Sequence, residues 1–315
     1  MTSSSLFNIV TFGYFMAMVL FLVYLATRSK QVALIANIVS WVGLVLHTAA
    51  FGYRWVESYQ MGYGRIPLTN LYESAVFFAW SVVLFYVLID LKYKQSSIGA
   101  FVIPFAFLTM NWAQLGYLPQ GIRSSLESMA RGVGDAWYTG FARTMLLGPG
   151  DTIEPLVPAL QSNWLTYHVI TCFIGYGAFA VACGVSIMYL IKARQEERAD
   201  EGAVGGLLGL FPSIKVLDDI NYKAILVGFP LLTLGIITGA AWANYAWGTY
   251  WSWDPKETWS LIVWFIYAAF LHARFTRGWV GKRAAWLSIF GFAATLFCYL
   301  GVNLLLSGLH SYGGG

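Results

Sequence analysis

Charged residues are scarce in this sequence: Asp, Glu, Lys and Arg make up only 11% of its 315 residues. Soluble globular domains carry about 25% of such residues, whereas 58% of this chain is hydrophobic. The composition therefore excludes an ordinary soluble protein and predicts an integral membrane protein. The net charge of +4 is small, and it gives no indication of nucleic-acid binding.

Cysteine is also scarce, with Cys172, Cys183 and Cys298 as its only instances, all inside apolar segments. No CxxC or CxxCH occurs, which argues against a thioredoxin-type site and against c-type haem attached to this chain itself. HxxxH and HExxH spacings are absent as well, which argues against a zinc site. We expect the three cysteines to be buried structural thiols.

Apolar runs with few charges are abundant, and several reach the length of about 20 residues that a membrane-spanning helix needs. We expect eight such helices; the seventh has a short apolar stretch, with Lys256 and Glu257 at its start. The sequence therefore predicts an all-α polytopic membrane protein, with residues 1–315 forming a single membrane domain. The expected helices cover residues 6–27, 32–54, 71–91, 98–116, 165–191, 223–246, 256–274 and 284–307.

The distribution of basic residues predicts the orientation of these helices. Thirteen of the nineteen Lys and Arg residues fall at one side of the membrane and six at the other. The positive-inside rule places the thirteen in the cytoplasm, or in the stroma of a plastid, so both termini are expected on the outer side. Basic residues follow rather than precede residues 6–27, so this run is expected to be a retained helix, not a signal peptide.

Two long loops connect the predicted helices. The outer loop, 117–164, contains Pro, Gly and mixed charges, and we expect short amphipathic helices across the mouth of the bundle. The inner loop, 193–222, contains VGGLLGLFPSIKVLDDI, whose apolar spacing predicts a helix lying on the membrane surface.

The four histidines are the main candidates for chemistry, because ionisable residues in membrane segments are rare and mark functional sites. His168 opens the fifth predicted helix and His310 follows the eighth, so both are expected at the outer side. Imidazole is a common axial ligand of haem iron. For a single histidine, a satisfied interfacial residue is the plainer interpretation, but two beside a tryptophan-rich loop favour haem. His47 and His272 lie inside predicted helices and are expected to form a second pair within the membrane.

The outer segment 242–259 contains WGTYWSWDPKE at residues 247–257. Asp254, Pro255 and Glu257 predict a helix start, with Asp as the N-cap, Pro at the first helical position and Glu three residues after the cap.

The tryptophans in this segment and shortly after it fall into two groups. Trp247, Trp251 and Trp253 are spaced to form a surface rather than a stripe, and Gly248 would allow a close backbone approach. The remaining tryptophans are expected in an interfacial belt or facing lipid: Trp242, Trp259 and Trp264. The basic residues Lys256 and Arg65 are candidates for pairing with haem propionates.

The pattern WGxxWxWDxxE closely resembles the tryptophan-rich WWD segment of a family of haem-handling membrane proteins with CcmC, CcmF and CcsA branches. The following TWSLIVWFIYAAFLHAR, through His272, and the upstream PLTNLYES, residues 67–74, also resemble this family. Eight helices and about 315 residues suit the CcsA branch, also called ResC. One departure is Tyr245, where many relatives have an acidic residue.

The resemblance implies cytochrome c maturation of the system II type, in which haem b is exported across the membrane and joined by thioether bonds to CxxCH of apocytochrome c. It also implies a CcsB or ResB partner and a bacterial cytoplasmic or thylakoid membrane. His168 and His310 would be the catalytic axial ligands of an outer haem, and His47 and His272 the ligands of an intramembrane one. The WWD segment would hold the outer porphyrin through Trp247, Gly248, Trp251, Trp253, Asp254 and Glu257.

Three other functions stay open at this point. One is a haem chaperone without ligation activity. Another is a di-haem b-type membrane electron carrier, and the third is a plain ion or solute transporter.

Overall fold

The structure is a computed structural model that describes residues 2–117, 120–131, 139–199, 207–306 and 308. Within these ranges, eight helical segments are long and apolar enough to span a membrane. This confirms the predicted all-α membrane fold. The spanning helices are α1 (Ser3–Thr27), α2 (Lys30–Gln60), α3 (Leu71–Tyr93), α4 (Gly99–Ala113), α7 (Asn163–Ala199), α8 (Ile214–Trp247), α9 (Pro255–Arg277) and α10 (Lys282–Leu296), the last continued by a π-helical turn (Phe297–Gly301) and α11 (Val302–Leu305).

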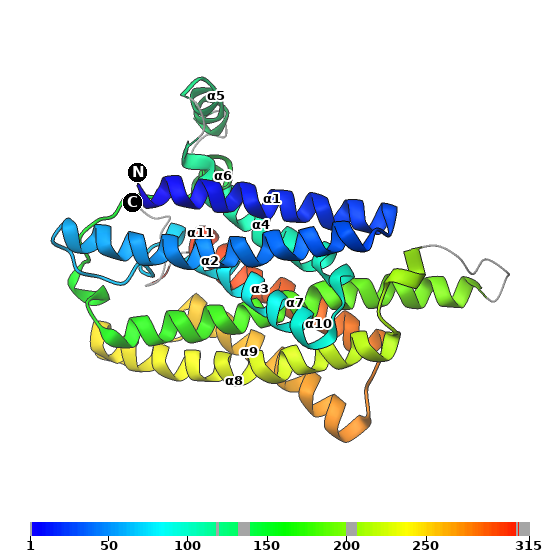
Figure 1. The fold of residues 1–315 in the computed structure, drawn as a ribbon. Coiled ribbons are helices and arrows are strands. Elements are labelled where there is room, and N and C mark those ends of the chain that lie inside the picture. Colours follow the sequence, from blue (N-terminus) through cyan, green and yellow to red (C-terminus); the bar gives the residue numbers. More distant parts are fainter. Residues whose placement is uncertain (1, 118–119, 132–138, 200–206, 307, 309–315) are drawn as a thin grey trace.

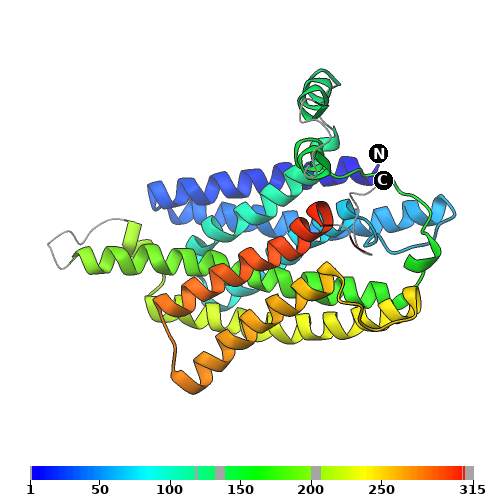
Figure 2. The same ribbon diagram turned by 180° about the vertical axis from the view of Figure 1, so that it is seen from behind.

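Helix α7 lies at the centre of the bundle. Helices α1 and α2 pack as an antiparallel pair on one side of it and α8 and α9 on the other, while α3, α4 and α10 pack directly against α7 (Figures 1 and 2). About 78% of the most apolar window of α7 is buried, against 28% for α1. Helix α1 starts at one end of the bundle (Figure 1). Helices α2 and α8 end there, and helices α3, α7 and α9 begin there. We call this the site end.

The helix boundaries at the site end follow from local capping. The Asn70 side chain accepts a hydrogen bond from the backbone N–H of Glu73 at the start of α3. Gly248, with φ +75°, ends α8 in the left-handed conformation that glycine adopts without strain. Asp254 then caps α9. Capping satisfies backbone groups that a helix end leaves unpaired.

Three helices extend well beyond the expected boundaries. Helix α7 continues to Ala199 instead of ending at residue 191. Helix α2 continues to Gln60 instead of ending at residue 54, because Arg54 is neutralised inside the bundle by Glu73 at 3.0 Å. Helix α8 begins at Ile214, within the segment expected as an inner loop with a surface helix. Its first turns are held at the bundle by Asp218, which pairs with Arg274 at 2.6 Å and accepts from Gly281 N–H.

The long connection between α4 and α7 contains two short helices, α5 (Gln120–Arg131) and α6 (Thr139–Leu147), so short helices are present in the expected outer loop. Helix α5 stands away from the bundle in both views (Figures 1 and 2). Residues 148–162, which we call the strap, cross the site end. Arg54 donates to the Asp151 carbonyl at 2.9 Å and Trp242 Nε1 to the Ala159 carbonyl at 2.9 Å, so the strap joins the α2 side of the bundle to the α8 side.

Candidate functional site

A chamber opens at the site end and encloses about 1060 Å³, open solvent at its mouth included. Its walls are residues 68–70, which precede α3, together with parts of α3, α7, α8, α9 and the end of the α10 span. Most of the lining is apolar, with a few polar side chains, as is typical of sites for small molecules and cofactors. The polar lining includes His168, Cys172, Tyr176, Lys256, Glu257, Ser260, Cys298, Tyr299 and Asn303.

His168 on α7 lines this chamber with its ring orientation fixed. Its Nδ1 lies 2.7 Å from the backbone carbonyl of Gly235. A carbonyl only accepts hydrogen bonds, so Nδ1 carries the hydrogen and, in the neutral ring, Nε2 keeps its lone pair. Trp242 stacks beside the ring at 6.2 Å between centroids and 19° between planes. A ring held in this way is the arrangement found for histidine ligands of metals.

Gly239 makes room for this histidine. A Cβ placed on Gly239 would come within 2.6 Å of His168 Nδ1, closer than van der Waals contact allows. The absence of a side chain at this position on α8 therefore allows the imidazole to reach Gly235.

The WWD tryptophans do not form one flat surface. Trp251 lines the chamber, and Trp253, which is 68% exposed, packs edge-on against it at 5.6 Å. Trp247 packs edge-on against Trp242 at 4.9 Å. Trp242 is only 4% exposed, so its expected place in an interfacial belt or facing lipid is wrong; it links Trp247 to His168.

The start of α9 confirms the predicted capping box. Asp254 Oδ1 accepts from Lys256 N–H at 2.9 Å, and Glu257 Oε2 accepts from Asp254 N–H at 3.2 Å and from Ser252 N–H at 2.7 Å. Both carboxylates thus hold the segment in place, while Glu257 also lines the chamber. Gly248 supplies the positive φ that ends α8, and nothing lies within 4 Å of an added Cβ there.

Lys256 is the basic side chain that faces the chamber. Its ammonium donates to Asn303 Oδ1 at 2.5 Å, from the last turn of the α10 span. Arg65, the other propionate candidate, is 8% exposed, does not line the chamber and pairs with Glu73 at 2.8 Å. The expectation that Arg65 would be available to a ligand in the chamber is therefore wrong.

The π-helical turn Phe297–Gly301 shapes the chamber floor. It presents Cys298 and Tyr299 to the cavity, and Tyr299 Oη lies 2.8 Å from Ser74 Oγ. Such turns recur at functional sites because they rotate the side chains that follow them. Cys172 is a second thiol in the chamber, with Sγ 3.7 Å from His168 Nδ1. All three cysteines are buried and free, as expected, but the sequence did not indicate that two line the cavity.

Comparisons with known proteins show the family of this chain. The model of the cytochrome c assembly protein family matches residues 68–310. The chain is 40% identical to the cytochrome c biogenesis protein CcsA of Guillardia theta over 278 residues, which cover 84% of this chain and 81% of the relative. It is 38% identical to CcsA of Synechococcus elongatus, covering 84% of this chain and 83% of that one. The chain belongs to the cytochrome c assembly protein family.

The fold has a solved counterpart. The cytochrome c haem lyase CcmF has a TM-score of 0.63 to this chain at 18% identity, covering 95% of this chain and 47% of CcmF. At this identity the likeness shows the shared fold. Membership in the cytochrome c assembly protein family makes cytochrome c maturation the process in which this integral membrane protein acts.

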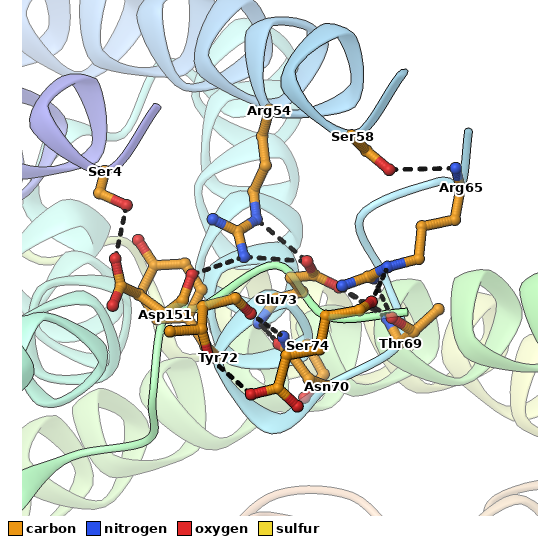
Figure 3. Close-up of polar contacts among 12 residues, drawn as sticks. Ser4, Arg54, Ser58, Arg65, Thr69, Asn70, Tyr72, Glu73, Ser74 and Asp151 are labelled. Atoms are coloured by element: carbon orange, nitrogen blue, oxygen red, sulfur yellow. Dashed lines mark hydrogen bonds and ion pairs between the residues drawn. The ribbon is translucent and has the colours of Figure 1, made fainter. Parts of the chain in front are cut away.

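On the α2–α3 side of the site end, beside the chamber, a cluster of buried charged residues fills the space between the helices. Glu73 receives Arg54 Nε at 3.0 Å on one carboxylate oxygen and Arg65 at 2.8 Å on the other (Figure 3). Thr69 N–H also donates to Glu73 at 2.9 Å. Arg65 Nε donates to the Glu154 carbonyl at 3.1 Å, so the cluster fixes the strap as well as joining α2 to α3.

The other two described histidines lie away from the chamber. His47 on α2 is fully buried, with Nδ1 3.0 Å from Tyr14 Oη. His272 is exposed on α9, and α2 packs on α1 and α3 whereas α9 packs on α8 and α10. The structure does not bring His47 and His272 together, so their pairing stays a prediction. His310 lies outside the described residues; Gly308, two positions earlier, lies against Asp254 and Pro255.

Proposed function

We propose that this chain holds haem in the chamber and, with a CcsB- or ResB-type partner, attaches it to the CxxCH segment of apocytochrome c. The observation that carries the proposal is the geometry of His168. Its Nδ1 hydrogen is committed to Gly235, which leaves Nε2 as a neutral ligand for iron at the wall of a largely apolar cavity.

The chamber supplies what a porphyrin requires besides an axial ligand. Trp251 lines the wall, and Trp242, supported by Trp247, backs the ligand histidine. Lys256 offers a cation for a propionate. Trp253, Gly248, Asp254 and Glu257 shape the segment that carries these groups, the two carboxylates through the capping box.

We assign the second axial position to His310. The support is the approach of Gly308 to Asp254 and Pro255, which brings the chain to the WWD segment two residues before this histidine. His47 and His272 are proposed to serve haem b inside the membrane, on the basis of the family resemblance. The excess of basic residues at the opposite end supports a periplasmic or lumenal location for the site end.

The ligation step is an addition. Each cysteine S–H of apocytochrome c adds across one haem vinyl group, so that an S–C bond and a C–H bond form while the S–H bond and the C=C π bond break. Atoms and electrons balance without an external oxidant. The contribution of this chain is to hold the haem edge and the thiols in one orientation, which lowers the entropic part of the barrier.

The histidine positions disfavour a di-haem electron carrier, because such proteins usually place ligands of both haems at two depths on the same helix. Among the described residues, His47, His168 and His272 lie on three different helices, α2, α7 and α9. A haem chaperone without ligation activity would use the same chamber and differs only in the product.

The test is co-expression with a CcsB-type partner and a c-type apocytochrome in a host that lacks its own maturation system. Covalent haem on the reporter after denaturing electrophoresis supports the synthase, and haem that stays only with this chain supports the chaperone. His168→Gly should abolish reporter maturation and lower the Soret absorbance of the purified protein by the share that belongs to the chamber haem, and added imidazole should restore both in part.

The matched control is Tyr167→Ala, because Tyr167 precedes His168 on α7, is 54% exposed and does not line the chamber. It should mature the reporter at the wild-type level. Unchanged haem content in His168→Gly would contradict the assignment of the axial ligand.

A further inference from the structure

A second cavity, which we call the outer groove, opens at the site end beside the chamber. Its walls are the end of α2 with the loop after it (residues 61–66), the second half of the strap (residues 155–162) and the first turn of α7. The groove is separate from the WWD segment, and no residue between 247 and 257 lines it.

Hydrogen bonds hold the loop and the strap, two of the three walls, in place. In the loop, the backbone N–H groups of Tyr63 and Gly64 donate to the Ser58 carbonyl at 2.9 and 3.1 Å. In the strap, Gln161 Nε2 donates to the Leu156 carbonyl at 2.8 Å, and the Gln161 carbonyl accepts from Tyr245 at 3.1 Å. A binding surface that is ordered before the ligand arrives loses less entropy on binding.

The outer groove is adjacent to the chamber, because Thr69 and Leu165 line both cavities. Leu165 and His168 are three residues apart on α7, and residues at this spacing are neighbours on one helix face. A ligand lying in the groove therefore ends within one helical turn of the proposed iron ligand.

The groove lining suits an uncharged ligand rich in hydrogen-bonding groups. Ser162, Asn163 and Thr166 offer hydroxyl and amide groups, which both donate and accept. Within the described part of the chain, the side chains of Asn163 and Thr166 make no hydrogen bond. Arg65 is the one charged residue of the described lining, and its pairing with Glu73 at 2.8 Å leaves no cation to attract an anion.

We infer that the outer groove binds the extended CxxCH segment of apocytochrome c and passes its thiols into the chamber between Thr69 and Leu165. An extended peptide presents alternating N–H and C=O groups, which match the groove lining. Tyr63, 41% exposed in the loop wall, provides an aromatic anchor of the kind that dominates peptide interfaces. This inference rests on the proposed function for the identity of the peptide.

The first test places the photo-cross-linker benzoylphenylalanine at Tyr63 in the full chain with its partner and apocytochrome c. The control position is Trp286, which is 62% exposed near the start of α10, away from the site end. Irradiation should trap apocytochrome c at position 63 and not at 286, both with CxxCH and with an SxxSH version that cannot be ligated. Equal trapping at both positions, or none at 63, would overturn the inference.

The second test blocks the groove with Thr166→Arg. Binding of the SxxSH apocytochrome should weaken by at least about tenfold, a loss of about 1.4 kcal/mol, while the Soret absorbance of the purified chain stays at the wild-type level. Wild-type affinity in this variant would contradict the inference.

The proposed function fails in a different way. If the wild-type chain traps apocytochrome c at position 63 but never produces covalent haem, the groove assignment stands and the synthase assignment is wrong.

Discussion

His168 and His47 are both histidines of spanning helices, yet their surroundings differ. His168 lines an open chamber, with Nδ1 on Gly235 and Nε2 available. His47 is packed on all sides, with its ring stacked on Phe51 at 5.4 Å and 4° and its Nε2 without a partner among the described residues. His168 can therefore accept a ligand as it stands, whereas His47 would need its packing to rearrange before haem could reach its free nitrogen.

The same contrast holds for the charges of the two halves of the site end. On the α2–α3 side, Arg54, Arg65 and Glu73 neutralise one another and fill the space between helices. On the α7–α9 side, Lys256 has a neutral partner, Asn303, and faces the cavity. One half stabilises the bundle, and the other leaves room and charge for a ligand.

Removing Glu73, the centre of the buried charge cluster, should have the largest effect on stability. Glu73→Ala leaves Arg54 and Arg65 buried without their carboxylate, and breaking such a pair costs about 3–5 kcal/mol. Thermal unfolding of the purified protein in detergent measures this. Glu196→Gln is the control, because the Glu196 side chain is 45% exposed and pairs with Lys192 at 3.8 Å. Loss of such a surface ion pair should cost about 0–1 kcal/mol of stability. Equal losses in both variants would mean that the cluster does not stabilise the bundle.

Substitutions in the His47 pocket should first show what the Tyr14–His47 hydrogen bond contributes to stability. Tyr14→Phe alone leaves His47 Nδ1 unpaired in an apolar setting, at a cost of about 1–3 kcal/mol. The double variant Tyr14→Phe, His47→Leu removes both polar groups and should recover most of that loss. Unfolding of the single and double variants gives the coupling between the two residues.

The double variant also decides whether His47 has a role beyond packing. If it unfolds like the wild type but exports no haem to the chamber, as judged by the Soret absorbance, the predicted intramembrane site is supported. A normal haem content and normal reporter maturation would remove His47 from the ligand set.

At the chamber, Gly239→Ala should displace the proposed axial ligand, His168. The added Cβ would lie 2.6 Å from His168 Nδ1, which pushes the ring away from Gly235. We expect haem content to fall about tenfold, equivalent to about 1.4 kcal/mol, by the Soret absorbance per protein. Gly13→Ala on α1 is the control, because nothing lies within 4 Å of its added Cβ; a loss of haem in that variant would point to a general effect of alanine.

The fold was predictable because apolar length is a property of the local sequence. Every predicted span is present, and the errors fall where a charge continues a helix. Arg54 and Asp218 remain in α2 and α8 because Glu73 and Arg274 neutralise them. These partners lie on other helices, so local sequence patterns do not reveal them.

The site was predictable only in part. The motif identified Trp251, Asp254 and Glu257, and the position of His168 at a helix start placed it at the same end. Trp242 was missed because its burial depends on how α8 is rotated against α7. Cys298 was missed because the π-helical turn changes the rotation of the residues at the end of the α10 span.

The smallest expected effect separates the two roles of Asp254. As the N-cap of α9 it accepts from Lys256 N–H at 2.9 Å, and Asp254→Ala should cost about 1 kcal/mol of stability. Asp254→Ser keeps a capping oxygen without the charge and should unfold like the wild type with full haem content. If the serine variant is stable but loses haem, the carboxylate acts on the ligand itself, because the serine hydroxyl preserves the cap. Asp254 would then contribute its negative charge to the chamber, in addition to capping α9.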